Sequence, residues 1–212
     1  MQSGTELNGP INQANDMPKQ LVFFLHGWGS DGNDLIQISH HWKNEMPNTT
    51  FLAPNGPEVC SGNPQGRQWF NILTDSNEII NVGLNNAFIL LDKYIQVHLN
   101  TYKLQKDNFF LVGFSQGAML ALFTSLRKKC KGIIGYSGAF LEKEIPKNFK
   151  KNDVLLVHGQ KDNVVPIARM KSAEKKLITL SSSIETQVYK DLEHSINEEG
   201  LALGSAFIKK RF

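Results

Sequence analysis

The chain has 212 residues, of which 41% are hydrophobic and 20% charged, and its formal net charge is +3. This length favours one domain with a sizeable core, and the composition excludes a disordered, collagen-like or supercharged chain. The near-neutral charge gives no support for nucleic-acid binding, which usually shows a concentrated basic face. Cys60 and Cys130 are too few for a disulfide framework and are expected to be reduced thiols.

The first 19 residues are polar and rich in turn-forming types, which predicts a loose arm or a short edge hairpin. They lack the basic start and the apolar stretch of a secretory signal, and no segment has the ~20 apolar residues of a membrane helix. We therefore expect residues 20–212 to form a single cytoplasmic domain that does not insert stably into a membrane.

Six hydrophobic runs predict β-strands in the rest of the chain. Continuous runs are typical of strands buried on both faces of a parallel sheet, and the last run alternates, as in a strand nearer an edge. The runs cover residues 21–25, 50–53, 109–112, 132–136, 154–157 and 184–189.

Helical periodicity separates these runs and predicts helices over residues 34–46, 82–99, 117–129, 166–180 and 197–212. Alternating strands and helices predict an α/β fold with a mostly parallel central sheet and helices on both faces. Right-handed crossovers then place the carboxyl ends of the strands at one edge, where ligands bind. The longest irregular segment, residues 54–76, is dense in Gly, Pro and Asn, and loops this long are often functional.

Residues 113–117 read Gly-Phe-Ser-Gln-Gly, between a predicted strand and a predicted helix. In this setting the pattern G-x-S-x-G is typical of a nucleophilic serine on a sharp, strained turn, where side chains at Gly113 and Gly117 would collide. The bare pattern is weak evidence, and its alternative is an ordinary turn with a capping serine. The flanking strand and helix favour Ser115 as a nucleophile.

A serine nucleophile needs a histidine base that is oriented by a carboxylate. Asp162 and His194 each lie just beyond a predicted strand, in the chain order Ser, Asp, His that α/β-hydrolases use. His158 is a weaker candidate for the base, because it precedes the turn that would project a side chain across the site. Among the acids, Asp153 starts a strand at the wrong end, and Asp191 lies too near His194 in sequence.

Backbone N–H groups that stabilise an oxyanion are expected from two segments. One belongs to Gln116, which follows the nucleophile, and the other to Trp28, in the loop after the first buried strand. His26, at the end of that strand, is interpreted as a structural residue that holds the loop by hydrogen bonds. No motif for a metal ion or a nucleotide cofactor is present, so neither is expected.

These motifs together resemble the phospholipase/carboxylesterase family, which includes the acyl-protein thioesterases and small bacterial carboxylesterases. The resemblance extends from about residue 21 to the C-terminus, and the variants at 33–35 and 67–70 are similar to the bacterial carboxylesterase branch. It rests on residues 24–35 (FLHGWGSDGNDL), 53–55 (APN), 68–70 (QWF), 113–117 (GFSQG), 158–162 (HGQKD) with 165–166 (VP), and 193–195 (EHS).

The resemblance implies a minimal α/β-hydrolase without a large cap domain. It implies the same triad and oxyanion donors as the residues themselves: Ser115, Asp162 and His194, with Trp28 and Gln116. It also implies that the segment 54–73 shapes an acyl-binding groove. The groove residues implied are Trp69, Phe70, Leu73 and Val165, for which the alternative is plain core packing. The loop 60–66 is polar, so no chain-length preference is carried over.

The expected function is hydrolysis of a small acyl ester or thioester by a serine carboxylesterase, through an acyl-enzyme on Ser115. One alternative is an acyl-protein thioesterase or lysophospholipase that acts on long acyl chains. A second alternative is a catalytically inactive hydrolase fold that serves as a binding module. A third is an additional role, in which the basic runs 127–131 and 209–211 bind anionic partners or membrane surfaces. Family members often pair as dimers, so the resemblance also implies a homodimer.

Overall fold

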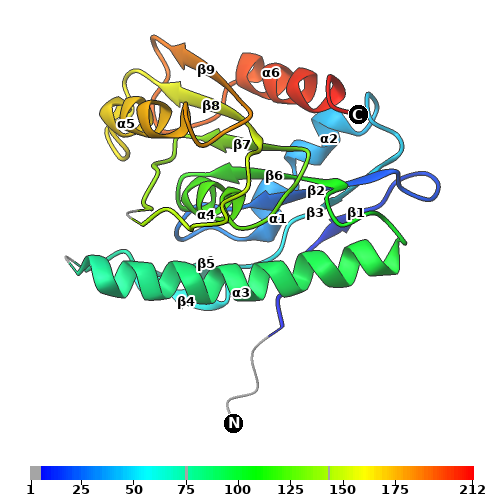
Figure 1. Cartoon of the computed structure of the whole chain (residues 1–212), viewed down its shortest axis with the longest axis horizontal. Coiled ribbons are helices and arrows are strands. Elements are labelled where there is room, and N and C mark those ends of the chain that lie inside the picture. Colours follow the sequence, from blue (N-terminus) through cyan, green and yellow to red (C-terminus); the bar gives the residue numbers. More distant parts are fainter. Residues whose placement is uncertain (1–5, 75, 143) are drawn as a thin grey trace.

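The computed structural model describes residues 6–74, 76–142 and 144–212. Its centre is a seven-stranded sheet in the order β1-β3-β2-β6-β7-β8-β9 (Figure 1). Neighbouring strands run parallel except β1, which pairs antiparallel with β3 at one edge. The mostly parallel sheet that the hydrophobic runs predict is therefore confirmed.

The six predicted strands are all present, with ends shifted by only a few residues, and β1 is added to them. Part of the segment 1–19 thus forms an edge strand, while residues 1–5 lie outside the described residues. The bounds are β1 Ile11–Asn12, β2 Gln20–Leu25, β3 Thr49–Leu52, β6 Phe109–Phe114, β7 Gly132–Tyr136, β8 Asp153–Gly159 and β9 Ser183–Tyr189.

Four of the five predicted helices are present as single helices, namely α3 Asn77–Thr101, α4 Gln116–Ser125, α5 Ile167–Leu177 and α6 Glu198–Lys209. The prediction of one helix over 34–46 is wrong, because this segment divides into α1 Gly32–Leu35 and α2 Ile38–Trp42. Between them, the N–H groups of Gln37 and Ser39 bond to carbonyls three residues back. Such bonds tighten the backbone and interrupt the regular α-helix.

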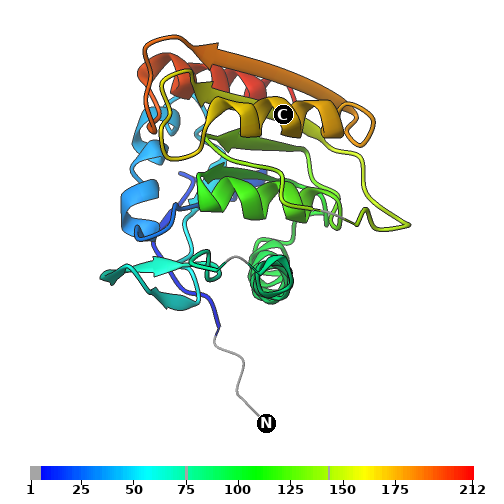
Figure 2. The ribbon, with the colours of Figure 1, turned by 90° about the vertical axis from the view of Figure 1, so that its left-hand side faces the viewer.

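Helices cover both faces of the sheet, as Figures 1 and 2 show. Alternate side chains of β2 point to opposite faces, as the pleat of a strand requires. Leu21, Phe23 and Leu25 join one apolar cluster with α3, α4 and α5. Val22 and Phe24 join a second cluster with α1, α2 and α6. Burial on both faces explains why β2 reads as a continuous apolar run.

The segment 54–76 contains a β-hairpin, so the prediction of an irregular loop over its whole length is wrong. The hairpin pairs β4 Glu58–Cys60 with β5 Asn63–Gln68 in antiparallel fashion. Its side chains are mostly polar and exposed, so the sequence lacks the apolar alternation that indicates a strand. The backbone of Arg67 bonds to Gly29 and Ser30, which fastens the hairpin to the loop after β2.

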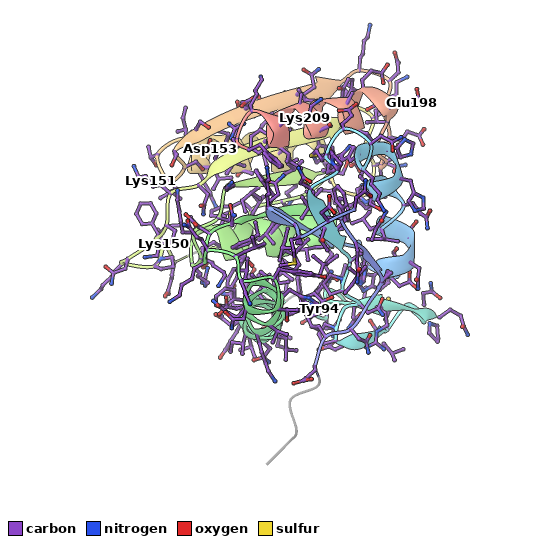
Figure 3. The ribbon with its side chains drawn as sticks, turned by 90° about the vertical axis from the view of Figure 1, so that its right-hand side faces the viewer. Tyr94, Lys150, Lys151, Asp153, Glu198 and Lys209 are labelled. Atoms are coloured by element: carbon purple, nitrogen blue, oxygen red, sulfur yellow. The ribbon has the colours of Figure 1, made fainter. Side chains whose placement is uncertain are left out.

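The basic runs at the helix ends are engaged within the molecule. Arg127 pairs with Glu142, Lys128 with Asp92 and Lys209 with Glu45. On the face shown in Figure 3, Asp153 lies between Lys151 and Lys209. These contacts favour the interpretation of the runs as helix-end residues. In the part of the chain that the structure describes, no helix is long and apolar enough to cross a membrane.

Candidate active site

Ser115 lies on the sharp turn between β6 and α4 that the G-x-S-x-G pattern predicts. Its backbone angles, φ 52° and ψ −114°, fall in a strained region for a non-glycine residue. A Cβ atom on Gly113 would collide with the backbone of residues 117 and 118, and one on Gly117 would collide with the backbone of Leu25. The predicted need for glycine at both positions is confirmed. Ser115 makes no capping hydrogen bond with its side chain, so its hydroxyl is available for other partners.

Asp162 and His194 meet at the carboxyl edge of the sheet, although they are 32 residues apart in sequence. Asp162 follows β8 and His194 follows β9, and these two strands are parallel neighbours. Nδ1 of His194 lies 2.8 Å from Oδ2 of Asp162, and Oδ1 of the same carboxyl accepts the N–H groups of Val164 at 3.0 Å and Val165 at 2.8 Å. The imidazole edge that carries Nε2 is thus left for a different partner.

The carboxyl group of Asp162 is held in its charged form. Burial by itself would raise its pKa, but the hydrogen bonds from His194 and from the N–H groups of Val165 and Val164 outweigh burial, so the pKa lies below its ordinary value. An ionised Asp162 accepts the proton on Nδ1 of His194. This fixes the tautomer in which Nε2 can accept a proton.

His158, the weaker candidate for the base, lies behind Asp162 and does not line the pocket described below. It is 1% exposed, and its Nε2 lies 2.7 Å from the carbonyl oxygen of Val165 and 3.3 Å from Oδ2 of Asp162. Because a carbonyl only accepts, Nε2 carries a proton. Within the described residues, its Nδ1 is buried without a hydrogen-bond partner. Through these contacts, His158 holds the 162–165 loop in position.

Trp28 and Gln116, which are predicted to supply the oxyanion donors, both line the pocket described below. Within the described residues, the backbone N–H group of neither residue donates to a protein acceptor. Gln116 is the first residue of α4, so the positive end of that helix faces the same place. The side chain of Gln116 bonds elsewhere, because its Oε1 accepts the N–H of Trp69 at 2.9 Å and its Nε2 donates to the carbonyl of Phe70 at 2.7 Å.

His26 holds the loop that carries Trp28, and its predicted structural role is confirmed. Nε2 of His26 accepts the N–H of Gly56 at 2.8 Å, so the proton resides on Nδ1, which lies 2.7 Å from the carbonyl of Gly27. Burial lowers the pKa of His26, because it disfavours the imidazolium form. A neutral His26 therefore links the loop after β2 to the turn that precedes β4.

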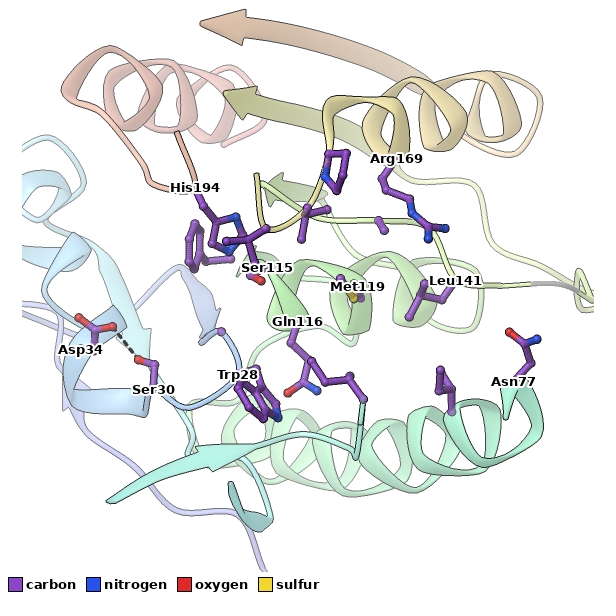
Figure 4. Close-up of a pocket in the computed structure, with 18 residues that line it drawn as sticks. Trp28, Ser30, Asp34, Asn77, Ser115, Gln116, Met119, Leu141, Arg169 and His194 are labelled. Atoms are coloured by element: carbon purple, nitrogen blue, oxygen red, sulfur yellow. Dashed lines mark hydrogen bonds between the residues drawn. The ribbon is translucent and has the colours of Figure 1, made fainter. Parts of the chain in front are cut away.

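Ser115, His194, Trp28 and Gln116 all line one pocket of about 610 Å³ (Figure 4). Asp34 and Ser30 form one end of it, with a hydrogen bond of 2.6 Å between them. The remaining lining residues are Gly27, Ile72, Asn77, Ile80, Phe114, Met119, Ala139, Leu141, Val164, Val165, Pro166 and Arg169.

Of the four groove residues that the family resemblance implies, Val165 lines this pocket. Trp69 and Phe70 are instead fully buried in the core below it, and Leu73 is 62% exposed. Hydrogen bonds explain why Trp69 and Phe70 lie in the core. The side chain of Gln116 bonds to the backbone of both aromatic residues, and the indole of Trp69 donates to the carbonyl of His26 at 2.9 Å. These bonds turn the two aromatic side chains away from the pocket.

Sequence reasoning missed the pocket residues that helices supply. Met119 lies one turn beyond Ser115 on α4, and Arg169 lies one turn beyond Val165 at the start of α5. Asn77 begins α3, five residues before the predicted start of that helix. A search one turn along each helix after a motif would have found the first two. Within the described residues, no group of three or more His, Cys, Asp or Glu side chains is placed to hold a metal ion.

Known proteins resemble this chain over most of its length. A family model described as phospholipase/carboxylesterase matches residues 8–212. Acyl-protein thioesterase 1 of Saccharomyces cerevisiae is 31% identical over 225 residues, which cover 96% of this chain and 98% of that protein. Esterase YpfH of Escherichia coli is 27% identical, with coverage of 90% and 83%. The crystal structure of esterase PE8 superposes with a TM-score of 0.92 at 37% identity and covers 98% of this chain and 100% of its own. The chain therefore belongs to the phospholipase/carboxylesterase family and is a hydrolase.

Proposed function

We propose that the protein is a serine carboxylesterase that hydrolyses small acyl esters or thioesters through a covalent acyl-enzyme on Ser115. The observation that carries the proposal is the common pocket. It is lined by Ser115 on a strained turn, by His194 bonded to an ionised Asp162, and by two residues whose backbone N–H groups donate to no acceptor among the described residues. Nucleophile, base and oxyanion donors are the parts that acyl transfer needs.

In the acylation step, Oγ of Ser115 attacks the substrate carbonyl and its proton passes to Nε2 of His194. The N–H groups of Trp28 and Gln116 donate to the oxyanion of the tetrahedral intermediate. The imidazolium, stabilised by Asp162, then protonates the leaving alcohol or thiol as its bond to the carbonyl carbon breaks. The product of this step is an ester between Ser115 and the acyl group.

In the deacylation step, a water molecule gives its proton to Nε2 of His194 and attacks the acyl-enzyme. The second tetrahedral intermediate collapses, Oγ of Ser115 recovers the proton, and the carboxylic acid leaves. Because the base has to be neutral, kcat/KM falls on the acid side of the pH profile through a single protonation.

The proposal is tested by replacing the members of the triad one at a time and together. Ser115→Ala, His194→Ala and the double variant are expected to lose activity on an acyl ester by a similar factor, on the order of 10⁴ or more, because the residues act as a unit. Ser172→Ala, at an exposed serine on α5, serves as the control. Esterase activity that survives in Ser115→Ala would contradict the proposal.

A second candidate function is hydrolysis of long-chain acyl thioesters, which the similarity to an acyl-protein thioesterase over nearly the whole chain favours. Comparison of esters and thioesters with C2–C4 and C12–C16 acyl groups separates the two candidates. A higher kcat/KM for C2–C4 substrates supports the carboxylesterase, and a higher value for C12–C16 thioesters supports the alternative.

A further inference from the structure

The pocket carries opposite charges at its two ends. Among its described lining residues, Asp34 is the one carboxylate and Arg169 is the one side chain that is always a cation. Figure 4 shows them on opposite sides of Ser115, with Asp34 beside Ser30 and Arg169 on the same side as Met119 and Leu141. A substrate that fills the pocket on both sides of the serine would meet a different charge at each end.

The position of His194 indicates which end of the pocket receives the leaving group and which receives the acyl group. In the proposed mechanism this histidine protonates the leaving group, so the leaving group has to lie on its side of Ser115. Figure 4 places His194 on the same side of Ser115 as Asp34. The acyl group then extends the other way, over Met119 and towards Leu141, which makes Arg169 the end of the acyl arm.

The wall of the acyl arm is apolar and its end is polar. Ile72, Ile80, Met119 and Leu141 supply apolar side chains along its length. At this end, Arg169 on α5 and Asn77 on α3 enter from opposite walls (Figure 4).

The end of the arm offers hydrogen-bond donors and positive charge. A guanidinium group presents donors in a fork that matches a carboxylate, and a carboxamide adds two more N–H groups. Asn77 is also the first residue of the 25-residue helix α3, whose positive end favours an anion.

Within the described residues, Arg169 forms no ion pair, and its side chain donates to no protein acceptor. This distinguishes it from Arg127 and Arg211, which both pair with carboxylates. Glu78 follows Asn77 on α3, but it is exposed and does not line the pocket. The cation at the end of the arm is thus available to a ligand.

We propose that Arg169, with Asn77, makes the acyl arm selective for acyl groups that end in a carboxylate, that is, for half-esters of short dicarboxylic acids. This inference rests on the proposed function and names its substrate class. Because Arg169 is exposed to solvent, the selectivity is modest, about five- to tenfold in kcat/KM, and it weakens as salt screens the charge.

The test compares two series of ethyl esters with the same leaving group. The first is the monoethyl esters of dicarboxylic acids from succinate to suberate, and the second is the matching monoamides, which have nearly the same shape but no charge. Hydrolysis is followed by titration of the acid released. The wild-type enzyme is expected to favour the acid over the amide at one or more chain lengths, and less so in high salt.

Arg169→Met keeps the apolar stem and removes the charge, and it is expected to lose the preference for the acid, so that the ratio of kcat/KM for acid and amide falls to about one. Lys171→Met, which removes the same charge from the same helix outside the pocket, is the matched control and should keep the preference. An acid-to-amide ratio that is the same in Arg169→Met and wild type at every length would overturn the inference. If the wild-type enzyme hydrolyses a C2–C4 acyl ester but neither series, the inference fails and the proposed function stands; if it hydrolyses no ester, both fail.

Discussion

At the scale of single residues, the carboxyl group of Asp162 is the most constrained part of the site. Its two oxygens take hydrogen bonds from His194 and from the N–H groups of Val164 and Val165, while His158 bonds to the carbonyl of Val165 and approaches Oδ2 of Asp162 from behind. The loop that carries the acid is therefore closed by His158 as well as by its own backbone.

Replacement of His158 by Phe is expected to lower kcat/KM about tenfold, because it leaves the carbonyl of Val165 unpaired and loosens Asp162. His158→Gln, which can keep an N–H donor towards the carbonyl of Val165, should restore most of the lost activity. A kcat/KM in His158→Phe equal to that of the wild-type enzyme would contradict this role for His158.

The position of Ser115, Asp162 and His194 at one edge of the sheet could be predicted from sequence, because each residue follows a strand of a parallel sheet. A run such as 109–112 or 154–157 fixes where a strand ends, and the topology brings those ends together. The directions of Trp69 and Phe70 could not be predicted in the same way. They depend on two hydrogen bonds with the side chain of Gln116, which is more than 40 residues away and has no local signature in the sequence.

At the scale of elements, the β4–β5 hairpin and the loop after β2 form one unit. Arg67 on β5 bonds through its backbone to Gly29 and Ser30, and its guanidinium donates to the carbonyls of Gly56 and Pro57 at 2.8 Å each. The indole of Trp28 donates to Oε1 of Gln68 at 3.0 Å. The proposed oxyanion donor of Trp28 is thus positioned by a hairpin that is distant in sequence.

Arg67→Met is expected to destabilise the protein by about 1–2 kcal/mol, because it removes two charge-assisted hydrogen bonds that are partly buried. Faster amide hydrogen exchange in β4, β5 and the loop 27–30 should accompany a several-fold fall in kcat. Gln65→Ala, at an exposed position on the same strand, is the control. If exchange in the loop 27–30 is the same in Arg67→Met as in the control, the hairpin does not support that loop.

The two errors in the predicted elements share a cause. The segment 34–46 has a helical pattern of apolar residues, but i→i+3 hydrogen bonds near Gln37 divide it. The hairpin is the reverse case, because its strands are exposed and polar while its long-range hydrogen bonds are well formed. Hydrophobic periodicity predicts which face of an element is buried. It does not predict structure that is determined by backbone hydrogen bonds alone.

At the scale of the whole molecule, loops and helix starts build the pocket around the carboxyl edge of the sheet, and no separate cap covers it within the described residues. Its walls come from the loops after β2 and β7, from Ile72, and from the first turns of α3, α4 and α5. Substrate selection therefore falls to helix starts and loops rather than to the buried core. The net charge of the chain is close to neutral, but opposite charges are separated within the pocket. Asp34 lies at one end of it and Arg169 at the other.

Acid should destabilise the fold from neutral pH downwards. Burial lowers the pKa of His26, and also that of His98, so below about pH 6.5 the unfolded chain binds protons that the folded chain excludes. The free energy of unfolding is then expected to fall as the pH drops from 7.5 to 5.5, by at most about 1.4 kcal/mol per pH unit for each proton.

Urea denaturation at a series of pH values measures this dependence. His26→Asn should be less stable at neutral pH but show a shallower dependence, since the excluded proton no longer has a site. An equal slope in the variant and the wild-type protein would mean that His26 is not the buried neutral group that the geometry indicates.

The central claim is that Ser115 becomes covalently acylated, and active-site labelling tests it most directly. A fluorophosphonate probe reacts with a serine only when base and oxyanion donors activate it. We expect the wild-type protein to gain the mass of one probe, located on the peptide that contains Ser115. Ser115→Ala should gain none, and Ser172→Ala should be labelled like the wild type. Labelling that persists in Ser115→Ala, or that is located on a different residue, would contradict the account.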